Sequence, residues 1–157
     1  MCAKLILLPN LLATSADKAA SLPPYVDAVV SNLDGLIAES EKGGRHFLMR
    51  HTPHFRDIPI ELLSEHKEEV DPLIDLMTGE TTWGLVSDAG MPCLADPGAR
   101  LVTRARKRGI TIEAIPGPTS ILLALALSGL PAQSFFFHGY PPKKPDERAI
   151  WIDSLSS

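Results

Sequence analysis

Short apolar runs alternate with segments of helical periodicity along most of the chain. Leu5–Leu8 is a continuous apolar run closed by Pro9, a pattern typical of a central strand that is covered on both faces. In Val70–Met77 the apolar residues recur three and four positions apart, and Gly79 follows where a helix C-cap belongs. This second pattern predicts a helix, and the rest of the chain divides in the same way.

The expected strands are Leu5–Leu8, Leu36–Ala38, Ile58–Leu63, Trp83–Ser87, Ile110–Ile115 and Phe135–Phe137. The expected helices are Tyr25–Leu33, Arg45–Arg50, Val70–Met77, a helix capped by Asp96 and running to Arg108, Thr119–Ser128 and Asp146–Leu155. Because strands and helices alternate, we predict an α/β fold with a parallel-rich sheet flanked by helices.

Composition narrows the classes of protein further. The chain has 157 residues, 45% of them hydrophobic, and a formal net charge of −4, which excludes a mainly disordered chain. The only cysteines, Cys2 and Cys93, form no CxxC pair, so a zinc ribbon or redox motif is excluded and reduced thiols in the cytoplasm are expected. The apolar run near the start is too short for a signal peptide or a membrane span, so we expect no membrane partner.

Two loops that follow predicted strands are suited to close approach of a ligand. Ligands of open α/β sheets bind outside the carboxyl ends of the strands. Gly90 lets the Ser87–Pro92 loop turn tightly, and Asp88 either accepts hydrogen bonds from a ligand or stabilises the turn. In the Pro116–Ser120 loop two prolines fix the backbone, while the hydroxyls of Thr119 and Ser120 either cap a helix or bind a ligand.

Other kinds of site lack their motifs. The chain contains no GxGxxG, no GxxxxGK[ST] and no GxSxG sequence, so the common nucleotide-binding and hydrolase motifs are missing. His51 and His54 are three positions apart, but Pro53 lies between them and no carboxylate is placed as a third ligand. We therefore expect no metal site.

Five motifs in the second half of the chain together resemble those of one family. They are Gly84–Pro92 (GLVSDAGMP), Ala95–Gly98 (ADPG), Ile115–Ser120 (IPGPTS), Ser128–Pro131 (SGLP) and Phe137–Tyr140 (FHGY). In this order they resemble the tetrapyrrole methylase superfamily of S-adenosylmethionine-dependent methyltransferases, and most closely its branch of 16S rRNA cytidine 2′-O-methyltransferases. The resemblance is looser before Gly84, where it rests on Leu5–Pro9 and Ile37–Glu39.

The resemblance implies two α/β domains with S-adenosylmethionine bound in the cleft between them, and a homodimer. Residues 1–115 are then the N-terminal domain, and residues 116–157 are the linker and the opening elements of a C-terminal domain that is incomplete, so the chain is expected to be truncated. The cofactor-binding residues that it implies are Pro9, Ser87, Asp88, Ala89, Gly90, Met91, Pro92, Pro116, Gly117, Pro118, Thr119 and Ser120.

For a ribose hydroxyl of ribosomal RNA as methyl acceptor, Glu39 and Asp88 are the candidates for a catalytic base. The segment Ala38–Lys42 (AESEK) differs from the Ala-Glu-Asp-Thr-Arg of the rRNA enzymes. A tetrapyrrole or corrinoid acceptor and a non-catalytic interaction module derived from this fold therefore stay open as alternatives. Basic residues that RNA could contact, or that form a solvated helix face, are Arg100, Arg104, Lys107 and Arg108, with further groups at Arg45, Arg50 and Arg56 and at Lys143 and Lys144.

Overall fold

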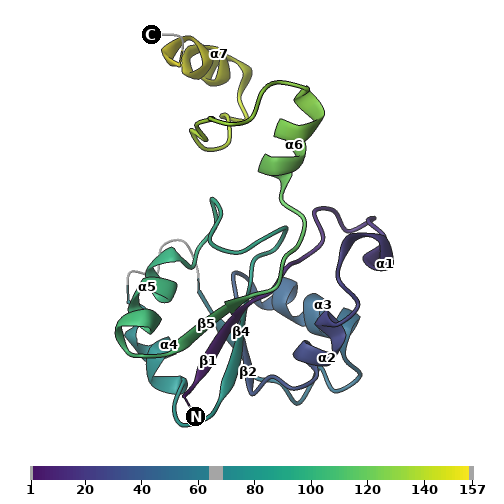
Figure 1. Ribbon diagram of the computed structural model, residues 1–157, viewed down its shortest axis with the longest axis vertical. Coiled ribbons are helices and arrows are strands. Elements are labelled where there is room, and N and C mark those ends of the chain that lie inside the picture. Colours follow the sequence, from purple (N-terminus) through teal and green to yellow (C-terminus); the bar gives the residue numbers. More distant parts are fainter. Residues whose placement is uncertain (1, 64–68, 156–157) are drawn as a thin grey trace.

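A five-stranded, fully parallel sheet forms the centre of the fold, in the strand order β3–β2–β4–β1–β5 (Figure 1). The computed structural model describes residues 2–63 and 69–155. The strands are β1 (Lys4–Leu7), β2 (Gly35–Ala38), β3 (Ile60–Leu62), β4 (Thr82–Val86) and β5 (Thr111–Ala114). Because all five run in the same direction, their carboxyl ends meet at one edge, where ligands of such sheets bind.

Helices cover both faces of this sheet. The helices of this part of the chain are α1 (Lys18–Ser21), α2 (Val26–Val30), α3 (Glu41–His51), α4 (Asp71–Leu76) and α5 (Ala99–Lys107). One apolar core joins Leu73 of α4 and Leu101 of α5 to Leu5 of the sheet. A second core on the opposite face joins Val30 of α2 and Phe47 of α3 to the sheet. The prediction of an α/β fold with a parallel sheet between helices is confirmed.

The helix predicted for Arg45–Arg50 begins earlier, at Glu41, because Ser40 caps it. The Ser40 hydroxyl accepts a hydrogen bond from the Gly43 amide at 3.0 Å. Gly44 does not break the helix but lets it approach the sheet, since a Cβ on Gly44 would stand 2.7 Å from the Cβ of Ala38. The glycine pair is thus a packing feature of the helix.

Two details of the prediction are wrong. Asp96 does not cap α5. The N-cap is Gly98, whose φ of 131° is a conformation that favours glycine, and no side chain caps this helix. Phe135–Phe137 is not a strand, because no described strand lies beside it to pair with its backbone. The short helix α1 was not predicted, since four residues are too few to show a helical period.

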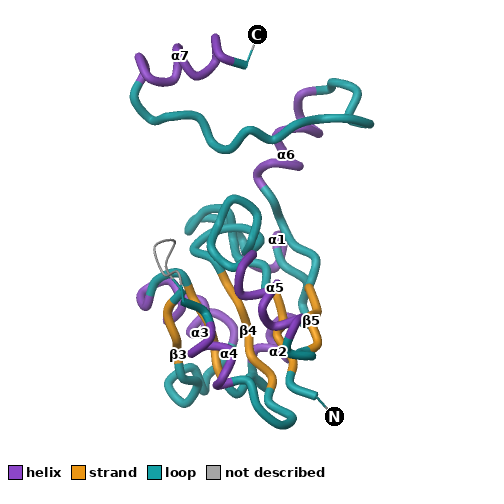
Figure 2. The backbone as a smooth tube through the Cα atoms, turned by 90° about the vertical axis from the view of Figure 1, so that its left-hand side faces the viewer, coloured by secondary structure: helices purple, strands orange, loops and turns teal. Residues whose placement is uncertain are grey.

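The segment after β5 stands away from the sheet (Figures 1 and 2). It contains α6 (Ser120–Ser128) and α7 (Pro145–Ser154), and no described residue from Pro116 onward is buried. Sixteen large hydrophobic side chains among the described residues are exposed, and eleven of them lie between Leu122 and Leu155. None of the described helices has the length and apolar character needed to cross a membrane.

Candidate functional site

Asn10 joins the loops at the carboxyl ends of β1 and β4. Its side-chain amide donates to the carbonyl oxygens of Ser87 at 2.9 Å and Asp88 at 3.1 Å. Its side-chain oxygen accepts from the Leu11 amide at 2.9 Å and from the Arg50 guanidinium at 3.0 Å. Asn10 is buried, so these bonds take the place of water and hold the Ser87–Pro92 loop against β1.

Gly90 and Gly117 allow this loop and the Pro116–Ser120 linker to approach their neighbours closely. The backbone of Gly90 has a φ of +71°, and a Cβ there would stand 3.1 Å from Leu12 and 3.4 Å from the carbonyl oxygen of Pro118. A Cβ on Gly117 would collide with the ring of Pro9, which is fully buried. Glycine is therefore required at both positions for the two segments to lie side by side.

Between the loop and the linker lies a hollow of about 310 Å³, which we name the linker hollow. Its lining residues are Leu12, Ala89, Gly90, Met91, Leu94, Asp96, Thr119, Ser120, Ile121 and Tyr140. The Ser120 and Tyr140 hydroxyls are hydrogen-bonded to each other at 2.8 Å across its rim. Thr119 caps α6, since its hydroxyl accepts from the Leu122 amide at 3.3 Å.

The predicted cofactor residues take three different positions around this hollow. Ala89, Gly90, Met91, Thr119 and Ser120 line it directly. The backbone segment from Pro116 to Pro118 continues from β5 into the linker beside it, without lining it. Pro9, Ser87 and Pro92 are buried and do not line it.

The two candidate bases lie together at the ends of β2 and β4. The Asp88 backbone amide donates to a Glu39 carboxylate oxygen at 3.2 Å. The Asp88 carboxylate accepts from the Ser40 hydroxyl, with its two oxygens at 2.9 and 3.1 Å. Asp88 is exposed to solvent, so its carboxylate is both oriented and accessible.

A second hollow, of about 370 Å³, opens between Asp88 and helix α3, and we name it the α3 hollow. It is lined by Asn10, Leu11, Leu12, Ala13, Thr14, Ser40, Lys42, Gly43, His46, Arg50, Asp88 and Ala89. Leu12 and Ala89 line both hollows, so the two spaces are neighbours at the carboxyl edge of the sheet.

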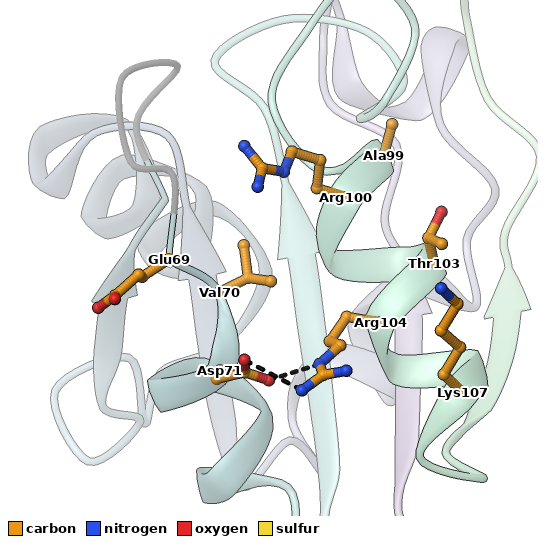
Figure 3. A pocket seen from close by; sticks show the side chains of 8 residues that line it. All are labelled: Glu69, Val70, Asp71, Ala99, Arg100, Thr103, Arg104 and Lys107. Atoms are coloured by element: carbon orange, nitrogen blue, oxygen red, sulfur yellow. Dashed lines mark hydrogen bonds and ion pairs between the residues drawn. The ribbon is translucent and has the colours of Figure 1, made fainter.

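A larger hollow of about 490 Å³ lies between α4 and α5 and contains none of the predicted cofactor-binding or catalytic residues, although Arg100, Arg104 and Lys107, which RNA could contact, line it (Figure 3). In it Arg104 forms a two-point ion pair with Asp71, with distances of 2.6 and 3.1 Å. The hydrogen bonds that Arg104 donates to the Asp71 carboxylate lower the pKa of Asp71 and raise the pKa of Arg104. Arg108 pairs with Asp75 at 3.5 Å. These two arginines hold α4 and α5 together.

The described histidines do not belong to a metal-binding cluster. His51 is buried against Phe47, and its Nδ1 lies 2.6 Å from an Asp27 carboxylate oxygen, which also pairs with Lys18 at 2.6 Å. His66 lies outside the described residues. Within residues 2–63 and 69–155 no three His, Cys, Asp or Glu side chains are placed to hold a metal ion.

Asn10, Ser40 and Tyr140 were not predicted as site residues. Ser40 could have been predicted from the local sequence, because serine is a preferred N-cap residue just before a helix. Asn10 and Tyr140 act through residues 77 and 20 positions away, and no local pattern connects them to those partners.

The geometry can now be compared with known proteins. A profile of the family described as Tetrapyrrole (Corrin/Porphyrin) Methylases matches residues 14–154, which is most of the chain and includes most of the residues that line the two hollows. The chain belongs to this family.

Several similar proteins share the name Ribosomal RNA small subunit methyltransferase I. The protein of Xylella fastidiosa is 35% identical over 152 residues, 94% of this chain and 54% of its own length. Those of Mycobacterium tuberculosis and Halalkalibacterium halodurans are 40% and 43% identical over 87 and 99 residues, which are 30% and 34% of their lengths. The chain spans about half the length, or less, of these curated relatives.

Proposed function

We propose that this chain is the part of an S-adenosylmethionine-dependent methyltransferase that binds the methyl donor and faces a ribose hydroxyl of ribosomal RNA. The observation that carries the proposal is the linker hollow. It brings the Ser87–Pro92 loop and the Pro116–Ser120 linker together at the carboxyl edge of a parallel sheet, the usual ligand site of such a fold.

The lining of the linker hollow fits S-adenosylmethionine. Leu12, Met91 and Ile121 offer apolar contact for a ring system, and Asp96 and Tyr140 offer polar groups for a ribose or an amino group. At Gly90 the hollow is bounded by bare backbone, where a Cβ would crowd Leu12 and Pro118. When bound, S-adenosylmethionine supplies a methyl group activated by a positively charged sulfur.

The protein's task is then to position the acceptor and to take up its proton. Holding two reactants in a reactive geometry removes most of the entropic barrier of a methyl transfer. Asp88 and Glu39 are the groups placed to accept the proton of a hydroxyl, and Ser40 orients the Asp88 carboxylate for this role.

The acceptor is inferred from the relatives, all of which bear the name of a small-subunit ribosomal RNA methyltransferase. No feature of the two hollows favours a tetrapyrrole, and none favours a purely non-catalytic role. An RNA acceptor places the reaction in the cytoplasm, where ribosomal subunits are made.

We also propose that residues 116–157 belong to a second domain and that the protein works as a homodimer. The exposed apolar side chains of α6 and α7 support both, because isolated helices do not retain such surfaces uncovered. Light scattering on the eluate of a sizing column tests the dimer, which is contradicted by the mass of one chain.

Calorimetric titration with S-adenosylmethionine tests the proposed cofactor site. We expect binding by the 157-residue chain and at least a tenfold loss in Ile121→Trp, which fills the linker hollow from α6. Leu127→Trp is the matched control, because Leu127 lies on the same helix, is 86% exposed and does not line the hollow. Absence of binding, or equal loss in both variants, would contradict the proposal.

A further inference from the structure

The α3 hollow has a charge distribution that the methyl-donor site does not explain. Three basic side chains line it at successive turns of α3, namely Lys42, His46 and Arg50. Beside the first turn of α3 stand Ser40 and the Asp88 carboxylate, which a Cβ on Gly43 would meet. The hollow is thus positive along one wall and negative at one corner.

Arg50 contributes to the fold through its hydrogen bonds, whereas Lys42 and His46 do not. Arg50 donates to Asn10, and its carbonyl oxygen accepts from Lys18 at 3.0 Å. Lys42 and His46 are exposed, and neither side chain forms a hydrogen bond or ion pair with any described residue. Their contribution to the fold is therefore small.

Lys42 is also badly placed for helix stability. It is the second residue of α3, in the first turn, where the helix dipole is positive and a cation is unfavourable. Because Lys42 gains nothing from the helix and has no partner among the described residues, its ammonium group is available to an anion in the α3 hollow.

We propose that the α3 hollow binds one nucleotide unit of the RNA acceptor, with a backbone phosphate at Lys42 and His46 and the ribose hydroxyl toward Asp88. This assignment rests on the proposed function and adds to it the residues that hold the substrate. The hollow adjoins the linker hollow through Leu12 and Ala89, so a hydroxyl beside Asp88 would stand next to the methyl donor. A space of about 370 Å³ suits a single nucleotide better than a four-ring macrocycle.

The salt dependence of RNA binding tests the phosphate contact. The probe is a fluorescein-labelled single-stranded RNA of about ten nucleotides, and its binding to the 157-residue chain is followed by fluorescence anisotropy at several KCl concentrations. For single strands the slope of log K against log salt changes by about 0.7 for each phosphate contact. We expect Lys42→Ala to reduce the slope by about that amount, His46→Ala to weaken binding, and Lys42→Arg to keep the slope of the unmodified chain.

Lys107→Ala is the matched control. Lys107 is an exposed lysine in the last turn of α5, beside the α4–α5 hollow, and its removal takes the same charge from the protein (Figure 3). We expect it to leave the slope unchanged. Equal reductions in Lys42→Ala and Lys107→Ala would overturn the proposal, because they would show a diffuse response to net charge.

Calorimetry with S-adenosylmethionine on the same samples separates this proposal from the proposed function. Intact cofactor binding without RNA binding would overturn the nucleotide site and leave the methyl-donor site standing. RNA binding that depends on Lys42, without cofactor binding, would overturn the methyl-donor site and leave the nucleotide site standing. Displacement of the RNA by an octacarboxylate porphyrin, again dependent on Lys42, would reassign the hollow to a tetrapyrrole and overturn the proposal.

Discussion

The Ser40 hydroxyl donates to the Asp88 carboxylate at 2.9 Å and so connects the carboxyl ends of β2 and β4. The same oxygen accepts from the Gly43 amide and caps α3. A single side chain therefore starts the helix that bears Lys42 and orients the carboxylate that faces it. Helix position and candidate base are coupled through this one residue.

Ser40→Ala is expected to lower the free energy of unfolding by about 1 kcal/mol, because α3 loses its cap and packs directly on the sheet. Urea denaturation followed by circular dichroism measures the loss. Thr119→Ala is the control, since it removes the equivalent cap from α6, which buries no residue in the core. A similar shift of the unfolding midpoint in both variants would contradict the coupling of this cap to the core.

Asn10→Ala is expected to cost about 3 kcal/mol of unfolding free energy, because it leaves the buried Ser87 carbonyl oxygen, the partly buried Asp88 carbonyl oxygen and the Arg50 guanidinium without their partner. Asn10→Asp should also destabilise the protein, since a carboxylate cannot donate to those carbonyls. In Asn32→Ala, an exposed asparagine loses one bond to Ala28, and the loss should stay below about 0.5 kcal/mol. Urea midpoints that rank these variants differently would show that Asn10 is not the central contact.

Gly90→Ala is expected to weaken S-adenosylmethionine binding about tenfold, whereas Gly109→Ala is expected to leave it unchanged. Both glycines have positive φ, +71° and +75°, so both substitutions carry a similar backbone strain of about 1 kcal/mol. Only at Gly90 does the added Cβ meet neighbours, Leu12 and Pro118 beside the linker hollow. Calorimetry and thermal unfolding together separate strain from ligand binding, and equal affinities would count against the assigned cofactor site.

His51 is expected to make stability depend on pH. Burial lowers its pKa in the folded protein below the ordinary value of about 6.5, and the hydrogen bond to Asp27 only partly opposes this. The unfolded chain then binds the proton more readily, so the stabilisation is complete above pH about 6.5 and declines as pH falls through the lower folded-state pKa.

The measurement compares urea unfolding between pH 7 and pH 5. His51→Asn keeps a donor toward Asp27 but does not titrate, so the loss of stability over this range should shrink in the variant. An unchanged pH dependence would show that other groups produce it. His54→Asn is the control, because His54 is exposed and lies 3.9 Å from Asp57.

Much of the architecture could be predicted from local patterns. The apolar run Leu5–Leu8 and the helical stripe of Val70–Met77 coincide with β1 and α4 to within a few residues. Such patterns are reliable because burial on one or both faces of an element imposes a period on its own sequence. Gly90 and the Pro-Gly linker were recognised for the same reason, since backbone conformations depend on the residues that adopt them.

The predictions failed where an element depends on a distant partner. Phe135–Phe137 has the composition of a strand, but a strand exists only through hydrogen bonds to a neighbour, and no described strand lies beside it. Aspartate is a common helix N-cap, but α5 begins after Gly98, two residues later. Asp96 instead lines the linker hollow.

By itself the sequence determined the alternation of strands and helices and the tight turns at glycine and proline, and it predicted a ligand site at two loops that line one hollow. Only the tertiary structure decided that Asn10 holds the loop after Ser87, that Ser40 orients Asp88, and that two hollows share a wall. The physical reason is the separation in sequence between the residues that interact. Periodicity and turn chemistry act between neighbours in the chain, whereas these contacts join residues 48 to 78 positions apart that meet only when the parallel strands align their carboxyl ends.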